Sequence, residues 1–339
     1  MSKVPFPQMK KKEPEIPEFN SVVTQLKQAS AGAASGFITR FITQPFDVLK
    51  IRFQLQVEPV RKHMPLLTNG AHKLPPTSKY TSMMQASRLI YKEEGLLAFW
   101  KGHNAGQLLT ITYTVFQFWS YEQIDLKLRH YENLRERKHL RQFLSGGLAG
   151  CVGTTISMPF DVIRTRVIGQ DPHLRDTSIT KLVPSIIEKE GFYGIFRGLG
   201  TTLIQIGPLI GFNFMFYHQL NDVYKNIVSP DHHHPPVVWG LVNGCMAGVI
   251  SKVVVYPLDF IKKRLQLQGF QESRKTFGRN QKCANIKECV RVTLKEEGIM
   301  GFYKGMYPTL FKSGLTTALY FSFYDIFKEL WVPEANVDD

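Results

Sequence analysis

A motif of eight residues that occurs three times constrains this 339-residue chain more than any other feature of its sequence. Each copy has proline in first place, aspartate in third, and basic residues in sixth and eighth. The copies read PFDVLKIR at 45–52, PFDVIRTR at 159–166 and PLDFIKKR at 257–264. A Glu-Gly pair follows each copy, and then an aromatic residue, a base and a second glycine. Repetition on this scale predicts one structural unit that is used three times.

Six long windows that are almost free of Asp, Glu, Lys and Arg accompany these motifs. A helix that crosses ~30 Å of hydrocarbon needs about 20 residues. The windows are 28–46, 102–121, 142–160, 198–221, 232–258 and 305–324, and three of them hold a single base, which is Arg40, Lys252 or Lys312. Buried helices of a soluble protein are the alternative. Because the windows have the length of a span and basic segments separate them, the sequence predicts six transmembrane helices.

The basic residues gather in three equivalent segments. The net charge is +14, and 26 of the 42 Lys and Arg residues fall in 48–101, 162–197 and 260–304. A nucleic-acid-binding protein would gather its bases on a recognition element or interleave them with stacking aromatic residues, so no nucleic-acid partner is expected. Membrane proteins keep an excess of Lys and Arg on the negative side. The three segments are therefore expected on one side of a membrane.

Each repeat reads as a span, a basic amphipathic segment and a second span. Short surface helices are expected at 80–93, 177–190 and 283–297. The expected organisation is a tail at 1–24, repeats at 25–125, 138–224 and 237–331, a tail at 332–339, and a loop insertion at 57–79 within the first repeat. The fold class is therefore an all-α membrane protein built from three repeats of about 100 residues.

The chemistry of the motif indicates a gate. Proline inside a helix removes a hydrogen bond and kinks the helix, so Pro45, Pro159 and Pro257 would let three helices converge. The acid and base that follow lie three residues apart on one helix face. They could pair within one helix, but threefold recurrence favours a ring between the repeats. Glycines thirteen and nine residues before each proline would allow close helix packing; they are Gly32, Gly36, Gly146, Gly150, Gly244 and Gly248.

These motifs resemble the signature of the mitochondrial carrier family, and the resemblance covers roughly residues 25–331. The resemblance implies a six-helix barrel with pseudo-threefold symmetry in the mitochondrial inner membrane, which works as a monomer by alternating access. It implies that the three short amphipathic helices lie on the matrix side and that both termini lie in the intermembrane space. It also implies that an anionic lipid such as cardiolipin binds at the matrix ends of the helices.

The resemblance implies a matrix gate of three ion pairs between the repeats. The pairs are Asp47 with Arg164, Asp161 with Lys262, and Asp259 with Lys50. The family often braces such pairs with a glutamine nine residues after the proline. Gln54 and Gln266 fit that position, whereas Ile168 does not, so the second repeat is expected to lack a brace.

The cytoplasmic gate of the family has an aromatic residue, an acid, two further residues and a base. Asp325 and Lys328 fit this pattern after Tyr324. Glu122 is followed by Asp125 where a base belongs, and the second repeat has His218 and Asn221 at the charged positions. The sequence therefore predicts a weak cytoplasmic gate and a resting preference for the outward-open state.

Substrate contacts in this family lie in the middle of the membrane. Counting from the motif glycines and prolines gives the positions Leu109, Gln205, Lys312, Arg40, Thr154 and Lys252. Three cations would then share one cavity with no acid beside them. Because unpaired buried cations are costly, an anionic substrate such as a phosphate or pyrophosphate is expected to offset that cost. The alternative is that the lysines snorkel to an interface.

Aromatic and amide side chains would bind the rest of the substrate. Tyr113 lies one turn beyond Leu109 and could stack on a ring or face a cationic ring, with a packing role as the alternative. Gln117 and Gln205 could read ring edges or join helices. Such a site suits thiamine pyrophosphate, and it also suits a nucleotide or coenzyme A. Within the family, 45–56, 98–113 and 247–270 resemble the members that carry thiamine pyrophosphate, so its exchange for nucleotides is the expected activity.

No catalytic motif is present in the sequence. GxSxG, HExxH and P-loop patterns are missing, so neither an enzyme nor a bound cofactor is expected. The His232-His233-His234 run lies beside prolines in a polar joint and reads as a loop, so no metal site is expected.

Overall fold

The computed structural model describes residues 19–56, 79–171, 179–227, 237–270, 283 and 285–331. Most of both predicted tails, nearly all of the insertion at 57–79, and His232-His233-His234 lie outside the described residues. The described chain divides into two compact units, one formed by residues 19–42 and 315–331 and the other by residues within 43–314. Each unit is described by itself.

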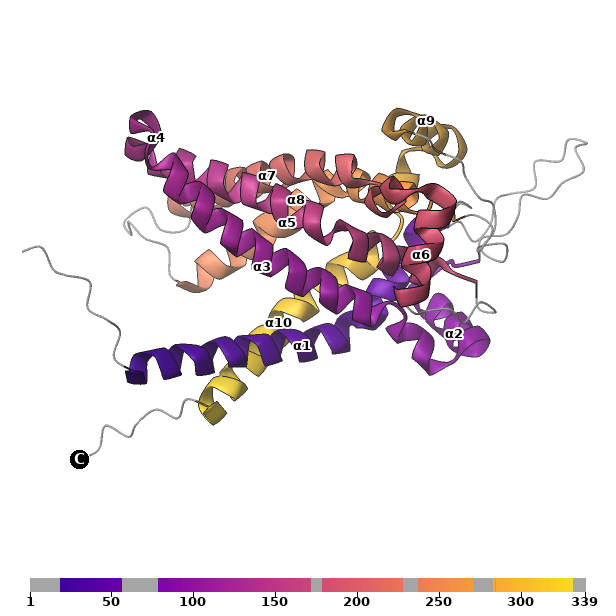
Figure 1. The fold of residues 1–339 in the computed structure, drawn as a ribbon, viewed down its shortest axis with the longest axis horizontal. Coiled ribbons are helices and arrows are strands. Elements are labelled where there is room, and N and C mark those ends of the chain that lie inside the picture. The colour runs from indigo at the N-terminus through magenta and orange to yellow at the C-terminus, as the bar shows by residue number, and fades with distance from the viewer. Residues whose placement is uncertain are drawn as a thin grey trace, which may run out of the picture. The chain divides into compact units, whose positions relative to one another are not determined.

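Six long helices account for the six predicted spans (Figure 1). They are α1 (Phe19–Leu55), α3 (His103–Leu128), α5 (Lys138–Gly169), α7 (Leu199–Ile227), α8 (Val237–Gln266) and α10 (Met306–Trp331). Among the described residues, Leu140–Gly169, Phe192–Tyr224 and Val242–Gln266 are each long and apolar enough to cross a membrane by composition alone. The predicted all-α class with three repeats is confirmed. The proline-bearing helices α1, α5 and α8 also extend well past their predicted spans, because the basic motif continues each helix.

Short helices follow the proline-bearing helix of each repeat, as predicted. They are α2 (Met83–Glu94), α6 (Ile179–Glu190) and α9 (Ile286–Glu297), each followed by a 3-10 turn, at Leu96–Trp100, Phe192–Phe196 and Ile299–Tyr303. The glycine between helix and turn has a positive φ in all three repeats, which glycine adopts without steric cost. Figure 1 shows α2, α6 and α9 at one end of the second unit, opposite the short helix α4 (Glu132–Glu136).

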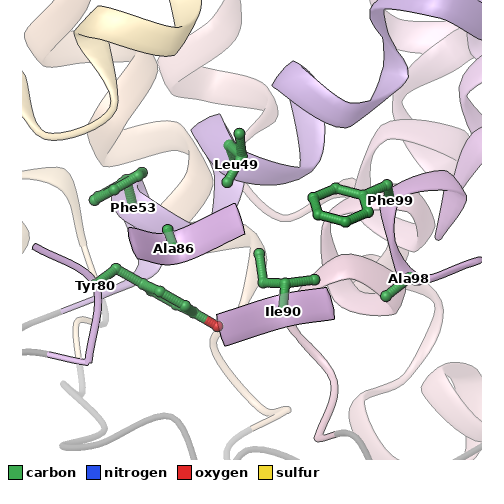
Figure 2. Close-up of a cluster of buried hydrophobic side chains, with 7 residues drawn as sticks. All are labelled: Leu49, Phe53, Tyr80, Ala86, Ile90, Ala98 and Phe99. Atoms are coloured by element: carbon green, nitrogen blue, oxygen red, sulfur yellow. The ribbon is translucent and has the colours of Figure 1, made fainter. Parts of the chain in front are cut away.

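Three equivalent apolar clusters fix the short helices in place. Figure 2 shows the first cluster, in which Leu49 and Phe53 of α1 meet Ile90 of α2 and Phe99 of the following turn. The second cluster joins α5, α6 and their turn, and the third joins α8, α9 and their turn. The apolar face of each amphipathic helix is therefore buried mainly against its own repeat, and Ala105 of α3 and Phe270 add contacts to the second cluster from the other two repeats.

A fourth cluster lies where the proline-bearing helices meet. Val48, Ile51 and Leu55 of α1 pack with Ile168 of α5 and with Leu267, which directly follows α8. Pro45, Pro159 and Pro257 lie inside these helices, one turn or more before the cluster. The three repeats thus converge at the eight-residue motifs that begin with these prolines.

The expected close packing holds for some of the predicted glycines and not for others. A Cβ at Gly36 would lie 3.8 Å from the Tyr320 ring, and one at Gly150 would lie 3.8 Å from Ile206 of α7. A Cβ added at Gly146, Gly244 or Gly248 would meet no described atom within 4 Å, so the packing role predicted for these three is wrong. A Cβ at Gly153 would lie 3.0 Å from the carbonyl oxygen of Tyr113, which marks the close approach of α3 to α5. In the first unit, Gly32 does contact α10, at 3.4 Å from the Tyr320 hydroxyl, and Ser35 donates to the Tyr320 carbonyl at 2.6 Å.

Many large apolar side chains on the long helices are exposed. Phe118 and Trp119 of α3 and Phe214 of α7 are each more than half exposed. Soluble proteins rarely leave apolar surface of this extent uncovered, whereas a helix in lipid does. The exposed surface therefore fits a protein that is surrounded by a bilayer.

Candidate functional site

Three ion pairs between the repeats form a ring at the convergence of the proline-bearing helices. Lys50 Nζ lies 2.6 Å from Asp259 Oδ2, and Lys262 Nζ lies 2.8 Å from Asp161 Oδ2. Arg164 Nη2 binds Asp47 Oδ2. In each pair the acid and base come from different repeats. The intrahelical alternative is therefore not the arrangement in the structure.

Glutamines contact two of the three pairs directly. Gln54 Nε2 donates to Asp259 at 3.3 Å, and Gln266 Nε2 donates to Asp161 at 2.8 Å. Ile168, which occupies the third equivalent position, packs in the apolar cluster instead. The Asp47–Arg164 pair has a different neighbour, since Gln44 Oε1 accepts from Arg164 at 3.3 Å. Sequence reasoning missed Gln44, whose only signal was a polar side chain directly before Pro45.

The ring contains more cations than the sequence indicated. Lys263 Nζ lies 2.8 Å from Asp161, so this carboxylate binds two lysines. Lys312 Nζ lies 2.7 Å from Oδ1 and 2.8 Å from Oδ2 of Asp47. The expectation that Lys312 has no acid beside it is therefore wrong. A lysine that points from α10 toward the proline helices reaches Asp47 because the repeats close into a ring, which the linear sequence does not display.

Within each repeat, a second set of ion pairs joins the proline-bearing helix to the short amphipathic helix. Arg52 donates twice to Glu94, at 2.5 and 2.8 Å, and Lys101 reaches the same carboxylate at 2.6 Å. The other two repeats have the same arrangement, with Glu190 between Arg166 and Arg197 and Glu297 between Arg264 and Lys304. One ion-pair network thus recurs in each repeat. It consists of the last base of the motif, the glutamate of the Glu-Gly pair and the base before the final glycine.

The pKa of Glu94 shows that its two bases stabilise the charged carboxylate in this network. Burial alone would raise the pKa of the Glu94 carboxyl, but the hydrogen bonds and charges of Arg52 and Lys101 outweigh burial. The pKa of Glu94 is therefore lowered, and the carboxylate stays ionised at neutral pH.

In each repeat, the glycine that precedes the second long helix packs closely against the backbone carbonyl of the ring-forming base of the next repeat. A Cβ at Gly102 would lie 3.2 Å from the carbonyl oxygen of Arg164, and one at Gly198 would lie 3.1 Å from that of Lys262. At Gly305 the distance to the Lys50 carbonyl would be 2.8 Å. The contacts run from the first repeat to the second, to the third and back to the first. This order is cyclic, as a pseudo-threefold arrangement requires.

A cavity of about 290 Å³ opens beside the ring between α3, α5 and α7. Two of the sequence-derived contact positions, Leu109 and Thr154, line it together with Tyr113. The remaining lining residues are Thr110, Ser157, Met158, Asp161, Thr202 and Lys262. Gln117 and Gln205 lie on the same helices, α3 and α7, but are not among the residues that line this cavity.

The predicted cations occupy different settings. Lys252 interacts electrostatically with Asp259 and Asp47, and among the described residues no ion pair joins it to an acid. Lys312 shares Asp47 with Arg164, and its side chain is 27% exposed. Lys312 is therefore bonded to the ring, whereas Lys252 lies within electrostatic range of the ring residues Lys50, Asp259 and Asp47. Arg40 lies on α1 in the first unit, where its side chain is partly buried.

The cytoplasmic gate positions that depart from the family pattern bind neighbouring helices instead. Asp125 accepts from Arg141 of α5 at 2.9 Å and from Arg129 at 2.8 Å. Asn221 of α7 accepts from Asn243 of α8 at 2.7 Å. Glu122 of α3 and Asp325 of α10 are exposed, and Lys328 is partly buried.

The three repeats, the ring and the cyclic turn contacts define a transport protein of the mitochondrial carrier class. The family model described as "Mitochondrial carrier protein" matches residues 21–132, 135–227 and 233–335, and the chain belongs to this family. It is a multi-pass protein of the mitochondrial inner membrane and a transporter, not an enzyme.

Similar proteins carry a more specific name. The chain is 38% identical to the "Mitochondrial thiamine pyrophosphate carrier" of Homo sapiens over 305 residues, which cover 90% of this chain and 92% of that protein. It is 39% identical to the protein of that name from Macaca fascicularis, with the same coverage. It is 32% identical to the "Mitochondrial thiamine diphosphate carrier 2" of Zea mays, over 92% of this chain and 96% of the relative.

Proposed function

We propose that this carrier transports thiamine pyrophosphate across the mitochondrial inner membrane in exchange for nucleotides, by alternating access between a matrix gate and a cytoplasmic gate. The observation that carries the proposal is the cationic group beside the ring. Lys312 binds Asp47, Lys252 lies within electrostatic range of Asp259 and Asp47, and Lys262 lines the adjacent cavity. The names of relatives that are 31–39% identical point to the same substrate.

The gate roles follow from the chemistry of the ring. A pyrophosphate offers several anionic oxygens, and it can compete with Asp47 for Lys312 because this lysine is partly exposed. Drawing Lys312 away from Asp47 weakens the bond network that closes the ring. Substrate binding and gate opening are then linked through one side chain. Replacing Lys312 would remove a gate ion pair together with a substrate anchor.

The remaining site assignments complete the proposal. Arg40, Gln117 and Gln205 contact the substrate with Tyr113, and Glu122, Asp325 and Lys328 form the weak cytoplasmic gate. The protein works as a monomer with both termini in the intermembrane space, and cardiolipin-like lipid binds at the matrix ends of the helices. A carrier of another phosphorylated cofactor, such as an adenine nucleotide, a deoxynucleotide or coenzyme A, is the second candidate, because the same cations would bind its phosphates.

Reconstitution in liposomes tests the substrate. We expect labelled thiamine pyrophosphate to be taken up by liposomes preloaded with nucleotide, and excess unlabelled thiamine pyrophosphate to compete more strongly than coenzyme A. Empty liposomes and the Lys252→Ala variant serve as controls. Uptake of nucleotide or coenzyme A with no uptake of thiamine pyrophosphate would assign the carrier to the second candidate.

A further inference from the structure

Two hydroxyl groups that line the cavity beside the ring already donate their protons to the backbone. Ser157 Oγ donates its proton to the Thr154 carbonyl at 3.3 Å, and Thr202 Oγ1 donates to the Gly198 carbonyl at 3.0 Å. A hydroxyl has one donor proton and two acceptor lone pairs. With the proton committed to the backbone, each hydroxyl can only accept a hydrogen bond from a ligand in the cavity.

The other polar groups of the cavity include both acceptors and donors, since Tyr113 and Thr154 have hydroxyls that can donate. Asp161 contributes a carboxylate, which accepts hydrogen bonds. Lys262 is the only cation that lines the cavity within the described residues, and its ammonium is 2.8 Å from Asp161. The preference for a ligand with free N–H donors therefore rests on the Ser157 and Thr202 hydroxyls, whose protons are used by backbone carbonyls.

The size of the cavity and its aromatic wall indicate a flat ring. Ligand pockets that hold a whole drug-sized molecule measure about 300–1,000 Å³, so a cavity of about 290 Å³ holds one ring of a larger substrate. Tyr113 offers an aromatic face, and Met158 offers a polarisable sulfur that packs well on rings.

We propose that this cavity binds the amino-substituted heterocycle of the substrate, and that Ser157 and Thr202 select an exocyclic amino group over an oxo group. The proposal rests on the proposed function, in which the pyrophosphate lies at Lys252 and Lys312. Lys262, which lines the cavity, and Lys252 both interact electrostatically with Asp259, so the cavity and the cation group lie within range of the same carboxylate. The two ends of the substrate are then separated by charge, with its amino group at the acceptors and its phosphates at the cations.

A competition assay tests the selection. Uptake of labelled thiamine pyrophosphate into liposomes is inhibited with unlabelled thiamine pyrophosphate or with oxythiamine pyrophosphate, in which an oxo group replaces the amino group of the pyrimidine. We expect the wild-type carrier to prefer the amino compound about tenfold, because an oxo group facing buried acceptors leaves them unpaired. Equal inhibition by the two compounds would overturn the inference and leave thiamine pyrophosphate transport intact. An absence of thiamine pyrophosphate uptake would overturn the proposed function and the inference together.

Substitutions at Ser157 and Thr202 test whether their hydroxyls cause the preference for the amino compound. Thr202→Val and Ser157→Ala remove the acceptors with little change in volume, and we expect each to reduce the tenfold preference. Thr155→Val is the matched control, since the Thr155 hydroxyl makes the same type of bond, to the Cys151 carbonyl at 2.8 Å, but does not line the cavity. A preference that persists in Thr202→Val and Ser157→Ala, or that falls equally in Thr155→Val, would show that these hydroxyls do not select the ring.

Discussion

Among the described residues, Asp161 binds three different side chains of the ring, whereas Asp47 and Asp259 each bind two. Its oxygens accept from Lys262, Lys263 and Gln266, each at 2.8 Å, and the side chain is buried. A buried charge pair that loses one partner costs about 3–5 kcal/mol, because the remaining charge stays desolvated. The ring-closed state therefore depends strongly on this one carboxylate.

The Asp161→Asn variant is expected to cycle slowly while still binding substrate. Since the cycle proposed above passes through the ring-closed state, we expect maximal uptake in liposomes to fall about tenfold or more. Substrate-induced thermal stabilisation in detergent should persist. Asp222→Asn, at an exposed position on α7, is the control. Normal turnover combined with lost binding would contradict the gate role.

Glu94 predicts a pH-dependent contribution to stability. Its folded pKa lies below the unfolded value of about 4.3, so its contribution is complete above that value and is lost as the pH falls through the folded pKa. We expect Glu94→Gln to lower the melting temperature at pH 7, and the difference from wild type to shrink as the pH falls below about 4.

Glu93→Gln is the neighbouring control for this experiment. Glu93 pairs with Lys79 at 2.8 Å, but the side chains are 35% and 20% exposed. Exposed pairs contribute about 0–1 kcal/mol, so a small and nearly pH-independent change is expected. Equal effects of the two substitutions would show that the buried ion-pair network does not stabilise the fold.

At the scale of elements, the turns before α3, α7 and α10 set how the repeats engage. Gly305 has a φ of +81° and Gly298 a φ of +69°, so alanine is strained at both, by about 1–2 kcal/mol. Only Gly305 is also crowded, because a Cβ there would lie 2.8 Å from the Lys50 carbonyl, whereas nothing lies within 4 Å at Gly298.

Gly305→Ala is therefore expected to damage the gate as well as the turn. The start of α10 must move away from the Lys50 backbone, which disturbs the Lys50–Asp259 pair. We expect a loss of uptake and a larger fall in melting temperature than Gly298→Ala produces. If both variants lose the same stability and transport equally well, the turn does not position the ring.

At the scale of the whole molecule, the ring and the departures at the cytoplasmic gate predict a resting state. The ring has three ion pairs and two additional lysines, whereas Asp125 and Asn221 are engaged with neighbouring helices. We expect the empty carrier to stay closed toward the matrix. A Thr154→Cys variant, with the four native cysteines replaced, should react faster with an impermeant thiol reagent from the intermembrane space. Predominant labelling from the matrix side would contradict this.

Much of the architecture could be predicted because it is written in local patterns. Charge-free windows give the spans, and the Glu-Gly pair gives the end of each short amphipathic helix, as Gly95 shows after α2. Recurrence of the motif predicted a ring of acids and bases between the repeats, and the family resemblance then assigned each acid its base. The close-packing glycine could not be predicted, because Gly153 differs from Gly146 only in what α3 places opposite it.

The sequence by itself determined the six helices, the three repeats and the acid–base register, since each is a periodic or recurrent property of neighbouring residues. The tertiary structure alone decided that Lys312 binds Asp47 across 265 positions of chain, that Lys263 joins Asp161, and that Gln44 meets Arg164. It also decided the polarity of the cavity, because the direction in which the Ser157 and Thr202 protons point depends on the nearest carbonyl. Contacts between distant residues depend on how the repeats close on one another, and no local pattern encodes that closure.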